Sequence, residues 1–304
     1  MTRTRTQALL ATLALRPLQC DGATGTQLQV LGLQSGECCE RWVTDHPDRV
    51  RHVHQRYLDA GADLLTTNTF GGTTLALAAH GLDTRAAGIN RAAARLAREV
   101  AGERAWVLGD MGPFGGILEP YGETEPATAA AAFLAQAAAL IEGGADALLV
   151  ETMSDPAESA LAIAAAREAG AELVIATFAF QRTPAGFRTM MGADAATAIR
   201  AALDAGATIA GANCGTQLSL DDYAKLTAEL TAAAAGAPVI VQPNAGSPER
   251  DPATGRITYG TAPGAFADAA ARYIALGARI VGGCCGTTPA HIVASACKNK
   301  KHAG

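Results

Sequence analysis

The chain has 304 residues, of which 49% are hydrophobic and 17% are charged, a balance typical of a globular protein with a large core. The net charge of −5 and the pI near 5.7 argue against nucleic-acid binding, which needs a basic face. No apolar run approaches the roughly 20 residues of a membrane span, and residues 1–15 do not resemble a signal peptide. We therefore expect a cytoplasmic protein that binds neither nucleic acid nor membrane.

Short apolar runs bounded by turn residues recur along the chain and predict eight strands. They cover residues 18–20, 63–67, 105–109, 147–150, 173–178, 208–212, 238–242 and 278–282. Alanine-rich stretches with helical spacing lie between them, for example 48–60, 86–100, 127–141, 156–168 and 194–203. Several helices lead into the next strand through a small-residue turn whose glycine fits a C-cap with positive φ, as at Gly61, Gly144, Gly206 and Gly277.

Eight strand–helix units, each with a strand that is hydrophobic throughout, predict an α/β fold of the (β/α)8 TIM-barrel type. A doubly wound open sheet is the alternative. Because no Pro/Ser-rich linker is present, we expect one barrel domain over residues 1–304, with residues 1–15 and 298–304 as terminal extensions. In such barrels the active site lies at the carboxyl ends of the strands, so the residues after each strand are the candidates for chemistry.

Seven cysteines in a reducing compartment argue against a disulfide framework. Cys214 follows the sixth predicted strand and Cys284 and Cys285 follow the eighth, so a barrel would bring the three thiols together above its mouth. Three thiolates with an open fourth position describe a catalytic zinc site. A substrate thiol bound there exchanges its proton for the metal and becomes a nucleophile. The alternative is that the three cysteines are small buried residues beside glycines.

Two carboxylates, Asp21 and Glu151, follow the first and fourth strands and are suited to bind a substrate ammonium group. Helix capping is the simpler alternative for either one alone. The backbone N–H groups of Gly22, Ala23 and Thr24 are candidates for binding a substrate carboxylate. Together these groups would recognise an amino acid. Three further polar residues complete the predicted substrate site: Thr67, Asn68 and Asn213.

Other polar residues give weaker signals. Cys38 and Cys39 lie in a loop with two glutamates, but no histidine at metal-ligand spacing accompanies them, and their role is left open. Cys20 is predicted inside a strand and Cys297 in a terminal helix. Three histidines lie on or just before the helix predicted over residues 48–60, and we predict them to be surface or capping residues: His46, His52 and His54.

Six motifs mark the ends of the predicted strands: DGATGT (21–26), TNTF (67–70), GPFG (112–115), ET (151–152), GANC (211–214) and GGCCGT (282–287). This set resembles the homocysteine S-methyltransferase family, which includes betaine–homocysteine methyltransferases, S-methylmethionine-dependent enzymes and the homocysteine module of cobalamin-dependent methionine synthase. The resemblance covers essentially the whole chain. It implies a barrel, a Zn²⁺ held by Cys214, Cys284 and Cys285 with homocysteine sulfur as fourth ligand, and Asp21 and Glu151 near the homocysteine amino group.

The methyl donor is less defined. Animal betaine-using enzymes resemble this chain but have tyrosines where it has Thr152 and Gly71, and a quaternary ammonium needs an aromatic cage. Only three aromatic residues are expected near the mouth: Trp42, Phe70 and Phe114. We expect methyl transfer from betaine or S-methylmethionine to homocysteine, giving methionine. Alternatives are a module that takes its methyl group from a separate corrinoid protein, methylation of another thiol or selenol, and a non-catalytic zinc- or thiol-binding barrel. The sequence leaves open whether a homo-oligomer forms.

Overall fold

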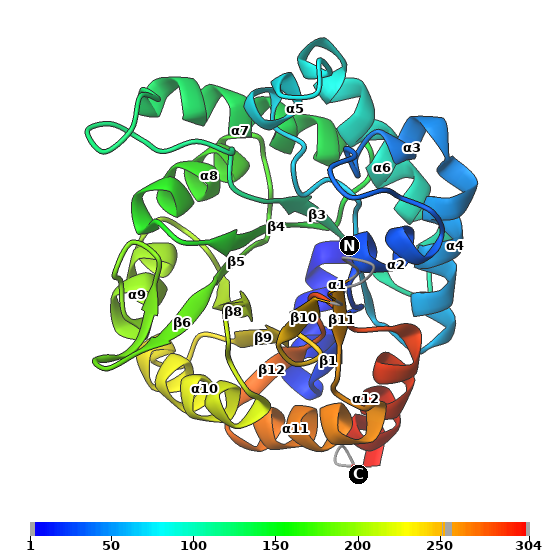
Figure 1. Ribbon diagram of the computed structural model, residues 1–304, viewed down its shortest axis with the longest axis vertical. Coiled ribbons are helices and arrows are strands. Elements are labelled where there is room, and N and C mark those ends of the chain that lie inside the picture. The colour runs from blue at the N-terminus through cyan, green and yellow to red at the C-terminus, as the bar shows by residue number, and fades with distance from the viewer. Residues whose placement is uncertain (1–3, 251, 253–256, 302–304) are drawn as a thin grey trace.

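The computed structural model describes residues 4–250, 252 and 257–301, without the side chains of 298–301. Eight parallel strands form one sheet in the order β1-β12-β9-β8-β5-β4-β3-β2. The sheet closes through a parallel bridge between Cys20, just after β1, and Leu64 of β2. Figure 1 shows the ring of strands with the helices outside it. The predicted TIM barrel is confirmed, and the open sheet is excluded.

Each barrel strand coincides with one predicted segment, apart from small shifts at the ends. The strands are β1 Leu18–Gln19, β2 Leu64–Thr66, β3 Trp106–Met111, β4 Ala147–Met153, β5 Val174–Phe178, β8 Ile209–Cys214, β9 Val239–Pro243 and β12 Ala278–Val281. The strands β4 and β8 run past their predicted ends, so Glu151 and Cys214 lie in the last residues of strands rather than after them. Polar residues are tolerated there because the mouth of the barrel faces a pocket.

The helices that alternate with the strands include the five predicted ones. These are α4 (Pro47–Asp59), α6 (Ala86–Ala101), α7 (Pro126–Glu142), α8 (Pro156–Glu168) and α9 (Ala195–Asp204). The helices after β1 are α2 Thr24–Val30, α3 Trp42–Asp45, α4 Pro47–Asp59, α5 Thr74–Ala78, η1 Asp83–Arg85, α6 Ala86–Ala101, α7 Pro126–Glu142, α8 Pro156–Glu168, α9 Ala195–Asp204, α10 Leu220–Ala234, α11 Pro263–Ala275 and α12 Pro289–Lys301. The predicted C-cap glycines all have positive φ, at 93° for Gly61, 102° for Gly144, 106° for Gly206 and 104° for Gly277. Cys297 lies in α12, as predicted.

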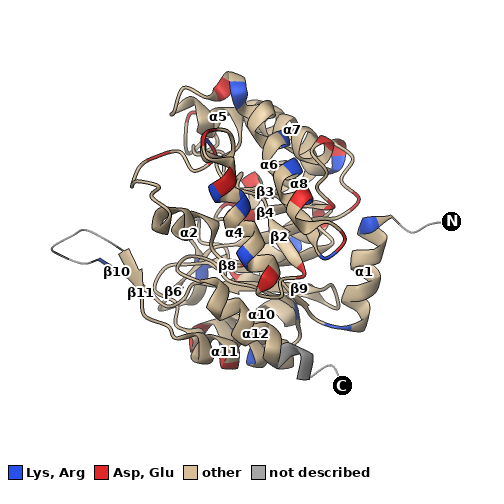
Figure 2. Ribbon diagram, turned by 90° about the vertical axis from the view of Figure 1, so that its right-hand side faces the viewer, with Lys and Arg blue, Asp and Glu red and all other residues tan. Residues whose placement is uncertain are grey.

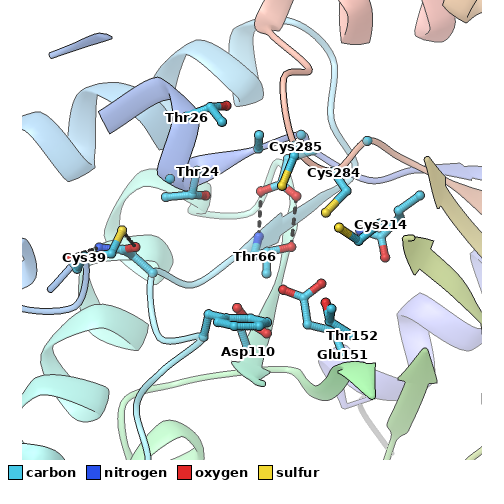
Figure 3. A pocket seen from close by; sticks show the side chains of 18 of the residues that line it. Thr24, Thr26, Cys39, Thr66, Asp110, Glu151, Thr152, Cys214, Cys284 and Cys285 are labelled. Atoms are coloured by element: carbon cyan, nitrogen blue, oxygen red, sulfur yellow. Dashed lines mark hydrogen bonds between the residues drawn. The ribbon is translucent and has the colours of Figure 1, made fainter. Parts of the chain in front are cut away.

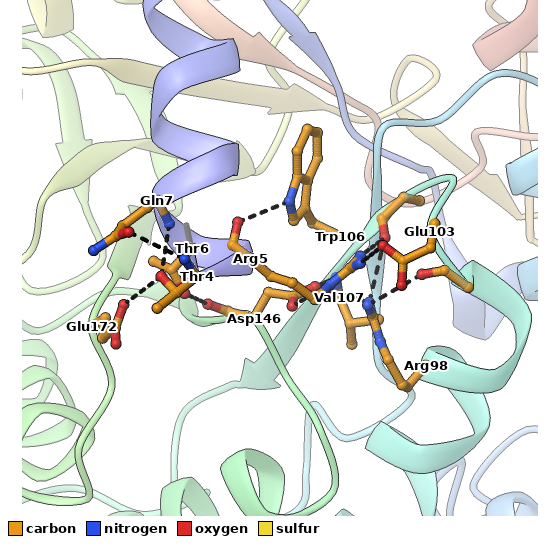
Figure 4. A network of polar contacts seen from close by, with 12 residues as sticks. Thr4, Arg5, Thr6, Gln7, Arg98, Glu103, Trp106, Val107, Asp146 and Glu172 are labelled. Atoms are coloured by element: carbon orange, nitrogen blue, oxygen red, sulfur yellow. Dashed lines mark hydrogen bonds and ion pairs between the residues drawn. The ribbon is translucent and has the colours of Figure 1, made fainter. Parts of the chain in front are cut away.

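The segment before the first strand forms helix α1 (Arg5–Leu15) and closes the amino-terminal end of the barrel. Leu9 and Leu13 of α1 are buried in a cluster with residues of the barrel strands. Arg5 donates to Asp146 over 2.9 Å, and Arg98 donates to the same carboxylate over 2.8 Å (Figure 4). Residues 1–15 were expected to be a terminal extension. Instead, α1 covers apolar side chains that this end of the barrel would otherwise expose. Residues 302–304 of the other expected extension lie outside the described residues.

Two hairpins that the sequence did not indicate follow barrel strands. One joins β6 (Phe180–Thr183) to β7 (Gly186–Thr189) after β5, and the other joins β10 (Pro248–Arg250) to β11 (Ile257–Tyr259) after β9. Their strands are short and largely polar, so they lack the apolar runs used for prediction. Figure 2 shows the β10–β11 hairpin at the end of the barrel opposite α1. Among the described residues, no helix is long and apolar enough to cross a membrane.

Candidate active site

A pocket of about 400 Å³ opens at the carboxyl ends of the barrel strands. Most of the predicted site residues line it: Asp21, Gly22, Ala23, Thr24, Thr67, Asn68, Glu151, Cys214, Cys284 and Cys285. Of the residues that the structure describes, no lysine, arginine or histidine lines the pocket. Its ionisable groups are therefore thiols, carboxyls and one phenol.

The structure brings the three cysteines of the predicted metal site together. The sulfur atoms of Cys214, Cys284 and Cys285 all lie within 4.8 Å of one another, and Figure 3 shows them gathered at one side of the pocket. Sulfur atoms at the corners of a tetrahedral zinc site with bonds of about 2.3 Å are separated by about 3.8 Å. Hydrogen bonds from Cys214 and from Cys284 lower the pKa of Cys285 to about 3. The cluster therefore holds negative charge, which suits a cation.

The backbone at Cys214 is strained. Cys214 has a φ of 53°, in the left-handed region, and the following Gly215 has a φ of 86°. A non-glycine residue in this region costs on the order of 1–3 kcal/mol and persists only where its surroundings hold it. The hydroxyl of Tyr223, on α10, donates to the carbonyl of Cys214 and helps to hold this turn. The chain thus leaves β8 in the conformation that presents the thiol to the other two.

Asp21 is held by the neighbouring strand β2. Its two carboxylate oxygens accept hydrogen bonds from the backbone N–H of Thr66 over 2.7 Å and from the Thr66 hydroxyl over 2.9 Å. Burial raises the pKa of Asp21 to about 7 and that of Glu151 to about 7. Both carboxyls are therefore rigid and costly to ionise without a positive partner. The sequence did not identify Thr66 as a site residue, because its role depends on the register between β1 and β2.

Asn213 was predicted to contact substrate, but it is fully buried and does not line the pocket. Its amide nitrogen donates to Glu151 over 2.7 Å and to the Thr152 hydroxyl over 2.7 Å. Its amide oxygen accepts from the Thr177 hydroxyl over 2.9 Å and from the Thr152 N–H over 3.0 Å. Asn213 therefore fixes the end of β4 and with it the Glu151 carboxyl.

The turn after β1 offers fewer free donors than the sequence suggested. The N–H of Ala23 donates to the Thr287 hydroxyl over 3.0 Å, so Ala23 is not available to a substrate carboxylate. A Cβ atom on Gly22 would lie 2.6 Å from that hydroxyl, which explains the glycine. In the described part of the chain, the N–H groups of Gly22 and Thr24 have no partner.

Thr67 and Asn68 line the pocket, but their side chains already have partners. The Thr67 hydroxyl accepts from the N–H of Asp110 over 2.9 Å. The Asn68 amide donates to the Cys39 carbonyl over 2.8 Å and accepts from the Cys39 thiol over 2.9 Å. These two residues therefore build the wall of the pocket.

The aromatic residues do not form a cage. Trp42 and Phe114, which were expected near the mouth, are 5% and 2% exposed and pack in core clusters. Phe70 lines the pocket and is 42% exposed. Tyr259 of the β10–β11 hairpin also lines it, although the sequence gave no reason to place that residue there. Phe70 and Tyr259 are therefore the two aromatic side chains that the described lining offers to a methylated cation.

Cys38 and Cys39 form no metal site, and the cluster of Cys214, Cys284 and Cys285 is the one candidate among the described residues. The Cys38 thiol donates to Glu40 over 3.2 Å, and burial raises its pKa to about 11. The prediction for His54 is wrong, because this side chain is fully buried on the apolar face of α4. Its pKa is lowered to about 4 by burial.

Asp110, at the end of β3, was not among the predicted site residues but lines the pocket. It is 3% exposed, and burial, followed by the charge of Glu151, raises its pKa well above the usual value. The rule that located Asp21 and Glu151 also points to this residue, since it too ends a strand. The sequence alone did not show that its side chain faces the pocket.

Comparisons with known proteins identify the family of this chain. A family model described as homocysteine S-methyltransferase matches residues 18–298. Two curated relatives, from Mycobacterium tuberculosis and Mycobacterium leprae, are both named methionine synthase. The first is 36% identical over 312 residues, covering 96% of this chain and 26% of the relative, and the second is 35% identical over 300 residues, covering 93% and 24%. The chain thus spans about a quarter of the length of these relatives.

Among solved structures, the metallated form of the homocysteine methyltransferase MmuM from Escherichia coli matches with a TM-score of 0.77 and 23% identity, covering 96% of this chain and 99% of that one. At this identity the likeness supports the fold. The family model covers nearly the whole chain, and the sequence of the first relative is 36% identical to that of this chain. The chain therefore belongs to the homocysteine S-methyltransferase family.

Proposed function

We propose that the protein is a zinc-dependent enzyme that transfers a methyl group from a small-molecule donor to the thiol of homocysteine, giving methionine. The observation that carries this proposal is the gathering of Cys214, Cys284 and Cys285 in a pocket that also contains the carboxyls of Asp21 and Glu151. Membership of the family supports homocysteine as the acceptor. Because the three thiols must stay reduced, the proposal places the enzyme in the cytoplasm.

The donor atoms fit Zn²⁺. Three thiols that face a pocket provide soft ligands and leave a fourth position for substrate, which is the arrangement of a catalytic zinc site. Cys214, Cys284 and Cys285 would hold the ion. When bound, the ion would lower the pKa of a substrate thiol so that the thiolate is present at neutral pH.

The residues around the cysteines would orient homocysteine. Asp21 and Glu151 would accept hydrogen bonds from its ammonium group, and the N–H groups of Gly22 and Thr24 would bind its carboxylate. Thr66 and Asn213 hold the two carboxyls in place, which lowers the entropy that substrate binding must overcome. Since Asn213 bonds to Glu151 and also precedes Cys214, it couples the ammonium position to the metal ligand.

The reaction would be a direct displacement. The homocysteine sulfur forms a bond to the donor methyl carbon while the bond from that carbon to the donor nitrogen or sulfur breaks, and the electron pair leaves with the donor atom. The proton of the substrate thiol would pass to solvent, because the attacking group is the thiolate. In both donors the atom that loses the methyl group becomes neutral: the nitrogen of betaine becomes a tertiary amine, and the sulfur of S-methylmethionine becomes a thioether. The lack of an aromatic cage favours S-methylmethionine, because its α-ammonium group provides N–H donors for hydrogen bonding and betaine has none.

A second candidate is a module that receives its methyl group from a separate corrinoid protein. Its support is the name methionine synthase given to the two relatives. Exposed apolar side chains in the segments that follow the barrel strands would suit a protein partner: Val30, Phe70, Ile117, Tyr121, Met190, Met191 and Ile257. A non-catalytic thiol-binding barrel is the third.

The test is zinc content and methionine formation on one purified sample, with homocysteine and betaine, S-methylmethionine or methylcobalamin. We expect one zinc per chain and methionine from a small-molecule donor. Zinc without turnover on any free donor would favour the corrinoid-dependent module or the non-catalytic barrel. Selenohomocysteine, tried as acceptor in parallel, would show whether another chalcogen substrate is preferred.

A further inference from the structure

The proposed binding of homocysteine leaves one buried carboxyl of the pocket without a role. Asp110 is 3% exposed, and its Oδ1 atom has no hydrogen-bond partner in the part of the chain that the structure describes. Figure 3 shows its side chain beside Glu151, on the far side of Glu151 from the cysteines. The carboxyl also has a hydrogen bond with Glu151, which contributes to its raised pKa. A buried carboxyl oxygen without a donor is destabilising unless a ligand supplies one.

The order of the strands places Asp110 across the mouth from the metal ligands. Around the ring the strands follow one another as β1, β2, β3, β4, β5, β8, β9 and β12. The cysteines follow or end β8 and β12, which lie on either side of β9, and β3 is the strand opposite β9. Homocysteine spans only about 5 Å from sulfur to nitrogen. With its sulfur at the cysteines, it reaches the nearer carboxyls first.

The charges in the pocket indicate a second cation. Four carboxyl groups line it, those of Asp21, Glu40, Asp110 and Glu151, and homocysteine brings one ammonium group. Glu40 is already occupied, since its oxygens accept from the Gly71 N–H over 2.7 Å and from the Cys38 thiol over 3.2 Å. No basic side chain among the described residues lines the pocket. The Oδ1 atom of Asp110 is thus left for the second substrate.

We propose that Asp110 binds the α-ammonium group of a sulfonium amino acid, such as S-methylmethionine, that serves as methyl donor. The inference rests on the proposed function. An oxygen without donors needs N–H groups, which an α-ammonium has and betaine lacks. Phe70 lies against Gly112, where a Cβ would come within 2.6 Å of the ring, and its face is available to the sulfonium.

The length of such a donor suits this position. Its methyl carbon would lie about 3–3.5 Å from the homocysteine sulfur before transfer. Its ammonium lies about 5 Å beyond its own sulfur, so the two amino acids together extend from the cysteines toward β3. On transfer, the new S–C bond forms as the donor's C–S bond breaks, the electron pair stays on the donor sulfur, and both molecules leave as methionine.

The test compares two sulfonium donors on the zinc-loaded enzyme. S-methylmethionine has an α-ammonium group, and dimethylsulfoniopropionate has the sulfonium and the carboxylate without it. For Asp110→Asn we expect kcat/KM with S-methylmethionine to fall roughly ten- to hundredfold, mainly through KM, because a charged hydrogen bond is lost. Turnover of dimethylsulfoniopropionate and the calorimetric Kd for homocysteine should not change. Asp110→Ser, with melting temperatures for both variants, controls for misfolding.

Several outcomes would overturn this inference. An unchanged ratio between the two donors in both variants would show that Asp110 does not contact the ammonium. Weaker homocysteine binding with the donor ratio intact would assign Asp110 to homocysteine instead. Methionine formed by the wild type only from betaine or a corrinoid protein would refute the sulfonium donor and leave homocysteine methylation standing. No methionine from any donor would contradict the proposed function itself.

Discussion

At the amino-terminal end of the barrel the buried carboxylate of Asp146 is surrounded by donors, whereas the carboxyls at the mouth have no basic partner. Asp146 accepts from Arg5, from Arg98 and from the N–H of Val107 at 2.7–2.9 Å (Figure 4). Asp21, Asp110 and Glu151 form no ion pair within the described residues. Buried charges are normally paired, so the mouth carries a cost that a ligand would offset.

The backbone differs between the two ends in the same way. At the amino-terminal end, positive φ values occur at glycines such as Gly61 and Gly144, where they cause little strain. At the mouth, Thr152 and Cys214 have φ values of 60° and 53°. Strain in side-chain-bearing residues gathers where chemistry needs a particular geometry. The amino-terminal end thus stabilises the fold, and the mouth gives up stability to position reactive groups.

The largest effect is expected from Cys214→Ala. The variant should lose zinc and lower the rate of methionine formation by at least about a thousandfold, because the substrate thiol loses the group that ionises it. Zinc content by atomic absorption and initial rates measure the two effects. Cys297→Ala, which removes an exposed thiol of α12, is the matched control and should keep both. A zinc-free Cys214→Ala protein with wild-type activity would refute the role of the cluster.

The next largest effect is expected from a substitution at the amino-terminal end of the barrel. Asp146→Asn should lower the free energy of unfolding by about 2–3 kcal/mol, since Arg5 and Arg98 lose their shared partner in a largely buried site. Urea unfolding measures this change, and kcat per folded molecule should stay the same. Loss of activity at full stability would break the division between the two ends.

The sequence predicted the barrel from the regular alternation of apolar strands and helices. It predicted the cysteine cluster because the cysteines lie at the carboxyl ends of two of those strands. The predicted strands are apolar runs. Cys214 ends one strand and Cys284 follows another, and any eight-stranded ring brings these two strands near one another. The side-chain environments of Asn213 and Trp42 depended on which way each side chain points, which the sequence does not specify. The apolar spacing of α4 did contain a signal for His54, because Val50, Tyr57 and Leu58 lie on the same buried face.

Tyr259 and Asp110 show two further limits. Tyr259 reaches the pocket on a strand of three residues, too short for any periodic pattern to reveal. Asp110 lies near the end of a strand, as Asp21 and Glu151 do, but its hydrogen bond with Glu151 and the lack of a donor to its Oδ1 atom depend on neighbours from other strands. Sequence patterns therefore located the mouth, and the contacts made by each carboxyl required the structure.

His54 tests whether a buried polar group without partners must be functional. Both ring nitrogens lack a partner among the described residues, and the side chain lies outside the pocket. Its pKa of about 4, against about 6.5 in the unfolded chain, means that the unfolded state binds more protons between these pH values. Stability due to neutral His54 is present above pH 6.5 and is lost as the pH falls toward 4, by up to about 3 kcal/mol.

His54→Leu should remove this loss. The difference in unfolding free energy between variant and wild type should grow in favour of the variant from pH 7 to pH 4, as measured by urea unfolding at several pH values. The rate of methionine formation at pH 7 should be unchanged. A variant that folds normally yet loses activity would show that an unpartnered group outside the mouth also serves function.

The smallest effect concerns Ala235, the one strained residue among those the structure describes that does not fit the comparison. Ala235 follows α10 with a φ of 49°, far from the pocket, and no hydrogen bond from its own side chain can hold it there. Ala235→Gly removes the steric penalty of the left-handed region, partly offset by the greater entropy of glycine in the unfolded chain. We expect the free energy of unfolding to increase by about 0.5–1 kcal/mol, seen as a rise of about 2 °C in Tm, with unchanged kcat.

Thr152→Gly, the matched change at the mouth, should instead lower kcat, because the Thr152 hydroxyl that accepts from Asn213 is lost with it. Equal effects of the two glycines on activity would mean that strain at the mouth has no more bearing on the reaction than strain elsewhere.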